Sequence, residues 1–244
     1  MIHHFLYNRI YPILDRKFIY DSYSCRVGKG TLFGIKRVMG FFMAIDRDIL
    51  FGLIMNGLRG TQPICKLLEF LIHKIVFNEP LKNAFFKSPE YAWEGLPPDK
   101  SLMNSAPNCG LPIGNLTSQV FANVYLNPLD HFVKRELKIK YYGRYVDDMV
   151  LVHSDKQVLL NAISSIRSFM QNKLNLTLHP KKIKLQPAAK GFAFLGAYIY
   201  PHGSVAGRRV VNNFKECIFS SLSNYEKQAQ RVQSYLGLLT HFRV

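Results

Sequence analysis

Cysteine and long apolar runs are both scarce in this chain. The four cysteines stand at positions 25, 65, 109 and 217. No two of them have the spacing of a zinc knuckle, and together they form no disulfide framework, so we expect reduced thiols in a cytoplasm. No apolar run approaches the ~18 residues that span a bilayer. The first residues, MIHHFLYNRI, also lack the charged start and apolar stretch of a signal peptide. We therefore expect no membrane partner.

Acidic residues are scarce as well. The chain has 16 Asp and Glu against 32 Lys and Arg, which gives a net charge of +16. This imbalance indicates a polyanionic partner, because each neutralised phosphate releases bound counterions and adds affinity. One alternative is a basic protein that is merely soluble. Another is an anionic membrane surface, although we find no basic amphipathic helix with a Trp, Phe and Leu face.

The length and the periodicity of apolar residues predict an α+β protein. With 244 residues, 48% of them hydrophobic, the chain can bury a core as one elaborate domain or two small ones. It contains no internal repeat and no low-complexity tract. Apolar residues at helical or alternating spacing predict the following elements: helices over 3–18, from 46 to 54, and over 63–77, 118–135, 158–170 and 212–240, a hairpin over 141–153, and strands over 174–178 and 191–200.

Two adjacent aspartates, Asp147 and Asp148, interrupt the apolar hairpin segment. Carboxylates placed there are costly unless a cation neutralises their charge. A tight turn can present both of them to divalent ions. Two Mg²⁺ ions about 4 Å apart can activate an attacking hydroxyl and stabilise a leaving phosphate group. The alternative is a solvent-exposed Asp-Asp turn, since Asp favours turn geometry.

The tetrapeptide Tyr145–Asp148, YVDD, resembles the central motif of reverse transcriptases. The run GLPIGNLTSQ over 110–119, followed by FANVYLN, resembles more narrowly the reverse transcriptases of diversity-generating retroelements. Group II intron enzymes carry Gln-Gly-x-x-x-Ser-Pro at this place, whereas this chain has Ile113 for the Gln and Gln119 for the Pro. An intron or retron enzyme is the nearest alternative, and these two residues argue against it.

The resemblance extends over nearly the whole chain and implies a right-hand polymerase fold. Residues 1–110 would form the fingers and the first part of the palm. Residues 111–205 would form the palm with the YVDD hairpin and primer-grip-like strands, and residues 206–244 a partial helical thumb. The implied activity copies a template-repeat RNA into cDNA, with errors at adenines, and the cDNA replaces a variable segment of a target gene. The implied partners are the template RNA, a DNA primer, dNTPs and a small basic helical accessory protein.

The resemblance also implies roles for individual residues. Asp147 and Asp148 would be the catalytic metal ligands for Mg²⁺, with Mn²⁺ as the alternative ion. A Gly-rich loop with basic side chains suits a triphosphate, and Phe42 would exclude a ribose 2′-hydroxyl. Gly196, in a primer-grip-like segment, would permit close backbone approach. The expected nucleotide-binding residues are Arg26, Lys29, Phe42, Lys181 and Lys182; those at the template or primer are Gly114, Ser118, Gln119, Leu195 and Gly196.

One position departs from the family pattern. With Phe42 as the aromatic gate, the first metal-bridging aspartate of the palm is expected at position 37, which is Arg37. The connection from Thr31 to Phe41 is also shorter than in the family, which indicates an internal deletion, and the two ends look truncated. Asp46 could substitute as a ligand, but it precedes an apolar helical series and is better explained as a helix cap.

Two hypotheses follow. The chain is either an active RNA-directed DNA polymerase or a catalytically inactive remnant that still binds nucleic acid through its charge.

Overall fold

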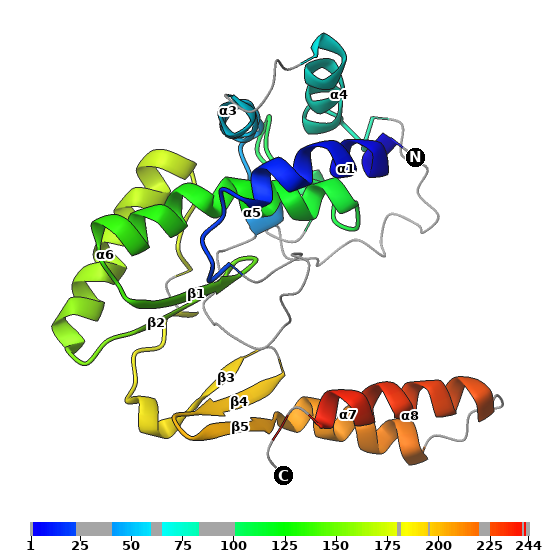
Figure 1. The fold of residues 1–244 in the computed structure, drawn as a ribbon, viewed down its shortest axis with the longest axis vertical. Helices are drawn as coiled ribbons and strands as arrows, with labels where there is room; N and C mark the ends of the chain where they lie inside the picture. The colour runs from blue at the N-terminus through cyan, green and yellow to red at the C-terminus, as the bar shows by residue number, and fades with distance from the viewer. Residues whose placement is uncertain are drawn as a thin grey trace.

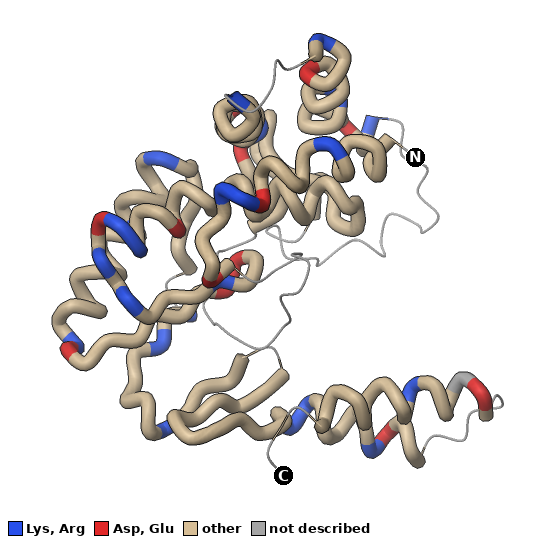
Figure 2. Tube along the Cα trace, viewed as in Figure 1, with Lys and Arg blue, Asp and Glu red and all other residues tan. Residues whose placement is uncertain are grey.

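The computed structural model describes residues 2–22, 41–59, 65–82, 101–179, 182–194, 196–219, 225–240 and 242. The described residues form helices and small antiparallel sheets, which confirms the α+β class (Figure 1). A helical layer lies on one side of a two-stranded hairpin, and a three-stranded sheet lies on the other side. Figure 2 shows that acidic residues are sparse along this trace, whereas basic residues occur on most of its helices.

The described residues contain α-helices at every expected position and one, α2, that was not expected. They are α1 (Ile2–Asp15), α2 (Phe41–Ala44), α3 (Arg47–Leu58), α4 (Lys66–Val76), α5 (Leu116–His131), α6 (Lys156–Leu174), α7 (Arg208–Phe219) and α8 (Tyr225–Leu239). A π-helical turn, η4 (Phe132–Glu136), continues α5, and short 3₁₀ turns occupy Leu102–Asn104 and Ala188–Lys190. The expected helix over 212–240 is two helices, which lie side by side next to the three-stranded sheet.

Helix α5 is the centre of the core. Helices α1, α3 and α6 pack against it, and the middle of α5 is buried on nearly every side. The partner helices each contribute one apolar stripe at the spacing of a helical turn. These stripes are Leu6, Ile10 and Leu14 on α1, Leu50, Ile54 and Leu58 on α3, and Ile166, Met170 and Leu174 on α6.

The hairpin is formed as the sequence predicts. Strand β1 (Tyr141–Tyr145) pairs antiparallel with β2 (Asp148–Val152), with Tyr145 opposite Asp148. Side chains alternate between the two faces of the ribbon. Tyr142, Arg144 and Met149 are buried, and Tyr142 and Met149 belong to the same apolar core as the helices. Packing of these side chains against the helical core therefore holds the hairpin in place.

Two strand predictions were wrong. Residues 174–178 do not form a strand: Leu174 ends α6, and Asn175 takes a left-handed φ of 48° that terminates the helix. Residues 191–200 are not one strand but β3 (Phe192–Phe194) and β4 (Ala197–Tyr200), which pair antiparallel. Gly196, with a φ of 83°, lies at the turn between them. A third strand, β5 (Gly203–Ala206), pairs with β4.

Within the described part of the chain, no helix is both long enough and apolar enough to cross a bilayer.

Candidate active site

The two aspartates lie at the tip of the β1–β2 hairpin. Because Tyr145 pairs with Asp148, only Val146 and Asp147 form the turn. A two-residue turn matches the twist of the strands when its first residue has a positive φ, which normally favours Gly, Asn or Asp. Val146 takes this conformation, with a φ of 51°. A β-branched residue is strained there, so the surroundings of the turn must stabilise it.

Asp148 lies on the face of the hairpin that is turned away from the helical core. It lines a cavity of about 520 Å³ together with Val150 and Val152, the alternate residues of β2. Leu151, His153 and Gly196 also line it, and the rest of the lining comes from α6, from the segment 182–188 and from strands β3 and β4. Asp147 and Asp148 are both half-buried. We call this space the Asp148 cavity.

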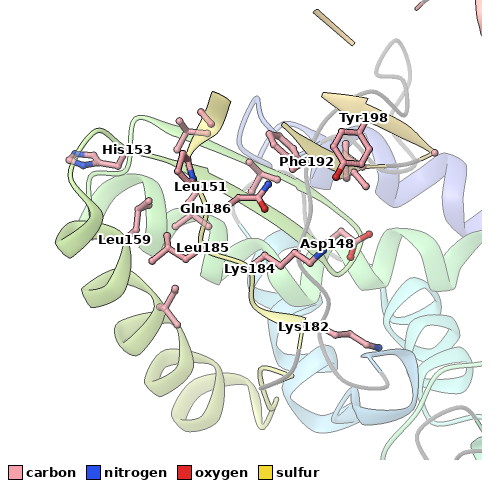
Figure 3. A pocket seen from close by; sticks show the side chains of 18 residues that line it. Asp148, Leu151, His153, Leu159, Lys182, Lys184, Leu185, Gln186, Phe192 and Tyr198 are labelled. Atoms are coloured by element: carbon pink, nitrogen blue, oxygen red, sulfur yellow. The ribbon is translucent and has the colours of Figure 1, made fainter. Parts of the chain in front are cut away.

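Two lysines of the described segments line the Asp148 cavity. Lys182, expected from the sequence, is one of them, and Lys184, which the sequence reasoning missed, is the other. Figure 3 shows the Lys184 side chain extending toward Asp148. The sequence carries only a partial signal, the alternation of Lys182 and Lys184 with the apolar Ile183; in the structure the two lysines are exposed and Ile183 is partly buried. Such alternation places both lysines on one face of an extended segment. The cavity therefore carries cations beside a carboxylate.

Beneath the turn, Arg144 is completely buried. Its Nε and Nη2 each donate to a carboxylate oxygen of Asp130, at 2.7 Å. Its Nη1 donates to the Val146 carbonyl oxygen at 2.7 Å and to Asn123 Oδ1 at 3.3 Å. Its Nη2 also donates to Ser22 Oγ at 3.2 Å. One side chain thus joins the turn to α5 and to the segment after α1.

The charges in this cluster are balanced. Burial alone would lower the pKa of Arg144, but the adjoining Asp130 carboxylate outweighs that effect and the pKa is raised. The guanidinium therefore stays protonated, and Asp147 also interacts with it electrostatically. Tyr142 donates a hydrogen bond to Asp130 Oδ1 at 2.7 Å. Burial first, and then Asp130, raise the pKa of Tyr142 well above its ordinary value, which keeps this donor protonated.

The expected template-contacting residues lie around the beginning of α5, outside the lining of the Asp148 cavity. Gly114 has a φ of 107° and open space where a Cβ would stand, and it is exposed, as is Gln119. Ser118 is buried and lines a second cavity of about 630 Å³, bounded by α1, α4 and the start of α5. The structure thus leaves Gly114 and Gln119 accessible to a ligand at the surface.

Phe42 and Asp46 belong to the region just before α3. Phe42, in α2, is half-buried, and its carbonyl oxygen accepts a hydrogen bond from Leu111 N at 2.8 Å. Asp46 is the N-cap of α3: its Oδ1 accepts from the backbone N–H groups of Asp48 and Ile49. Its Oδ2 accepts from the Asn175 side chain at 3.0 Å. The expectation that Asp46 is a helix cap is confirmed.

Gly207, which has no Cβ, allows its backbone to approach that of Gly196 closely. Gly207 N donates to the Gly196 carbonyl oxygen at 2.7 Å. A Cβ on Gly207 would lie 2.5 Å from that oxygen. Gly196 also lines the Asp148 cavity. Five residues that the sequence singled out lie outside the described residues: Arg26, Lys29, Arg37, Lys181 and Leu195.

The donor set at the turn suits a hard cation. Mg²⁺ is commonly held by one or two carboxylates together with phosphate oxygens of a substrate, and Asp147 and Asp148 supply two carboxylates from consecutive positions. Among the described residues, no cluster of three or more His, Cys, Asp or Glu side chains could hold a metal ion. Asp147 and Asp148 therefore fit one side of a metal site.

Comparison with known proteins agrees with this geometry. The family model described as reverse transcriptase (RNA-dependent DNA polymerase) matches residues 65–199. The match is more than half of the 244 residues, and it includes α5, the hairpin, both cavity lysines and Gly196. It does not include the segment with Arg26, Arg37 and Phe42. No curated protein matches the chain. The chain belongs to the reverse transcriptase (RNA-dependent DNA polymerase) family.

Proposed function

We propose that this chain is the RNA-directed DNA polymerase of a diversity-generating retroelement, copying a template-repeat RNA into cDNA. The observation that carries the proposal is the turn at Asp147 and Asp148, presented at the edge of a cavity that also contains Lys182 and Lys184. Carboxylates that hold a divalent ion and cations that face phosphate are the two charge types that nucleotidyl transfer requires. The family match supports the general activity.

The proposed mechanism is two-metal nucleotidyl transfer. Mg²⁺, or Mn²⁺ in its place, would supply activation of the primer 3′-oxygen and stabilisation of the leaving pyrophosphate. Asp147 and Asp148 would hold it. Lys182 and Lys184 would stabilise negative charge on the triphosphate from the cavity side, because a preorganised cation costs no rearrangement during the reaction. Arg26, Lys29 and Lys181 would complete the phosphate contacts, and Phe42 would gate the sugar.

We assign the remaining contacts by position. Gly114, Ser118 and Gln119 at the start of α5 would lie by the template base, and Leu195 and Gly196 by the primer. In this assignment residues 1–110 are the fingers and first part of the palm, 111–205 the palm, and 206–244 a partial thumb built on α7 and α8. The expected partners are template RNA, a DNA primer, dNTPs and a small basic helical accessory protein.

Primer extension on an RNA template with Mg²⁺ tests the activity. The wild-type chain should extend the primer, and a double Asp147→Asn, Asp148→Asn variant should not. Asp155→Asn is the matched control, because Asp155 is an exposed N-cap at α6 and asparagine caps helices equally well. Failure of the wild-type chain to exceed the double variant would contradict the proposal. A near-duplicate pair of genomic repeats differing at adenines would test the retroelement assignment.

Arg37 favours a second candidate function. A two-metal site needs carboxylates from two separate strands, and a cation stands where the family pattern places the second one. The chain would then bind nucleic acid without copying it. This candidate predicts salt-sensitive RNA binding and no incorporation. Inserting an aspartate-bearing palm strand between Thr31 and Phe41 should restore extension; if it does not, the proposed internal deletion is wrong.

A further inference from the structure

The turn that carries Asp147 is held in a conformation that its own residues disfavour. Val146 has a φ of 51°, a region that β-branched residues avoid because the side chain collides with its own backbone. Such a conformation persists only where surrounding contacts determine it. The position of the two aspartates therefore depends on whatever stabilises Val146.

Two contacts stabilise Val146: its side chain packs against the hydrophobic core, and its carbonyl oxygen accepts a hydrogen bond from Arg144. Arg144 Nη1 donates to the Val146 carbonyl oxygen at 2.7 Å. The five N–H groups of a guanidinium point in fixed directions, and Arg144 makes five hydrogen bonds, to Asp130, Asn123, Ser22 and Val146. The other four hydrogen bonds therefore fix the orientation of the guanidinium that donates to Val146.

Asp130 both orients the Arg144 guanidinium and balances its charge. It lies in α5, and its two oxygens accept from Nε and Nη2 of Arg144 in a bidentate pair. Both side chains have no exposed surface. A bidentate pair fixes the plane of the guanidinium. It also offsets the charge of Arg144, so that the buried cation would not repel a metal ion held by Asp147 and Asp148.

We propose that Arg144 and Asp130 are positioning residues that hold the strained Val146 turn and thereby aim Asp147 and Asp148. Both side chains are completely buried and act through the turn. The inference rests on the proposed function only in taking those aspartates to be the metal ligands. The positioning of the turn itself can be tested without catalysis.

An ion pair that only stabilises the fold and an ion pair that positions the turn should respond differently to replacement by apolar residues. Replacing a buried pair by apolar residues of similar volume is often tolerated, so an apolar replacement separates the two roles. The variant is Asp130→Leu, Arg144→Met and Tyr142→Phe, which removes the pair together with the tyrosine hydroxyl that donates to Asp130. Val146→Gly is the second change, because glycine adopts a positive φ at no steric cost.

Amide hydrogen exchange of residues 141–152, relative to residues of α3 and α5, measures the turn directly. The apolar triple variant should accelerate exchange at the hairpin by about tenfold while α3 and α5 stay protected, since one net hydrogen bond and the strain are at stake. Adding Val146→Gly to the triple variant should bring the hairpin to within about threefold of the Val146→Gly protein alone. Hairpin exchange that is unchanged in the triple variant, or equally fast with and without glycine, would overturn the proposal.

A conservative variant covers the case in which the triple variant does not fold. Arg144→Lys keeps a cation beside Asp130 but cannot make the forked contacts. Its hairpin exchange should also rise by about tenfold with the core protected, and Val146→Gly should suppress the rise; lack of either effect contradicts positioning.

Primer extension adds a second measurement. Arg144→Lys should raise the Mg²⁺ concentration for half-maximal rate by at least about threefold. An inactive wild-type chain would contradict the proposed function alone, because hydrogen exchange still decides the positioning role.

Discussion

Asp46 shows how a single residue can carry two interpretations that only geometry separates. The aromatic Phe51, five residues after it, made Asp46 a candidate for the second metal-binding carboxylate. In the structure, Oδ1 receives two backbone N–H groups of α3, and Oδ2 receives the Asn175 side chain. Both oxygens are therefore engaged in fixing the start of one helix and the end of another.

We expect Asp46→Ala to lower the free energy of unfolding by about 1–2 kcal/mol, because the cap and the Asn175 contact are both lost. Asp46→Asn retains a capping oxygen and should cost only about 0.5 kcal/mol. Urea unfolding measures the change in free energy for both variants. Asp155→Ala is the control, because Asp155 caps α6 through one side-chain hydrogen bond, to Gln157 N. If Asp46→Asn folds normally but abolishes primer extension, the capping account is contradicted and Asp46 is a ligand.

Cys109 is a residue whose reactivity the structure predicts. Burial is the largest cause that raises the pKa of its thiol, and the carboxylates of Asp46 and Asp48 raise it further. The thiolate is the reactive form, so iodoacetamide should modify exposed Cys65 faster than Cys109 at neutral pH. Peptide-resolved mass spectrometry measures the two rates in one sample.

The same shift has a consequence for stability. A thiol with a raised pKa in the folded state contributes stability below its ordinary pKa, and this contribution is lost as pH rises through the folded value. Cys109→Ser should therefore weaken the alkaline loss of stability in unfolding experiments. An unchanged alkaline profile would show that the thiol is not responsible.

At the scale of elements, the spacing of apolar residues predicted the helices and the hairpin, because these elements depend mainly on residues that are close in sequence. The apolar stripes of α1, α3, α4 and α6 fix helices because each stripe needs one buried face. The hairpin was predictable because two apolar runs flank Asp147 and Asp148, although the observed turn is one residue earlier, at Val146 and Asp147. The strand predictions at 174–178 and 191–200 failed because a left-handed residue stands inside each apolar run: Asn175 ends α6, and Gly196 lies at the turn between β3 and β4. Alternation alone does not reveal where such a residue stands.

The glycine pair that joins β3–β5 to α7 gives a prediction at this scale. Gly207→Ala should destabilise the protein by about 1–3 kcal/mol, because its Cβ would meet the backbone oxygen of Gly196, which cannot move aside. Gly52→Ala is the matched control: Gly52 lies inside α3 with nothing within 4 Å of the added Cβ. It should stabilise the helix by roughly 0.5–1 kcal/mol. Thermal unfolding should move in opposite directions for the two variants.

At the scale of the whole molecule, the site is assembled from segments that no local pattern connects. Asp147 and Asp148 were predictable because their motif is contiguous. The Arg144 cluster was not, since its partners come from Ser22, Asn123 and Asp130. Lys184 was missed because its significance depends on the packing of its segment beside β2. Contacts between distant positions arise from tertiary packing, which one sequence does not specify residue by residue.

The net charge makes a prediction about binding that does not require catalysis. A charge of +16 with lysines beside the Asp148 cavity should give RNA affinity that falls steeply with salt. For single strands the slope of log K against log salt is roughly −0.7 per phosphate contacted. Fluorescence anisotropy with a labelled RNA should give a wild-type slope of about −3 or steeper. Lys182→Ala and Lys184→Ala should each reduce its magnitude by about 0.7.

The control for this measurement is Lys82→Ala. It removes the same charge, but Lys82 is exposed and pairs with Glu79 at 2.6 Å, in a part of the chain outside the cavity lining. If the three variants change the slope equally, RNA binds through the overall positive charge of the protein and not specifically at the Asp148 cavity. If only Lys182→Ala and Lys184→Ala change the slope, RNA binds at the Asp148 cavity. That result would place the nucleic acid beside the metal-binding turn, because Lys182, Lys184 and Asp148 line one cavity.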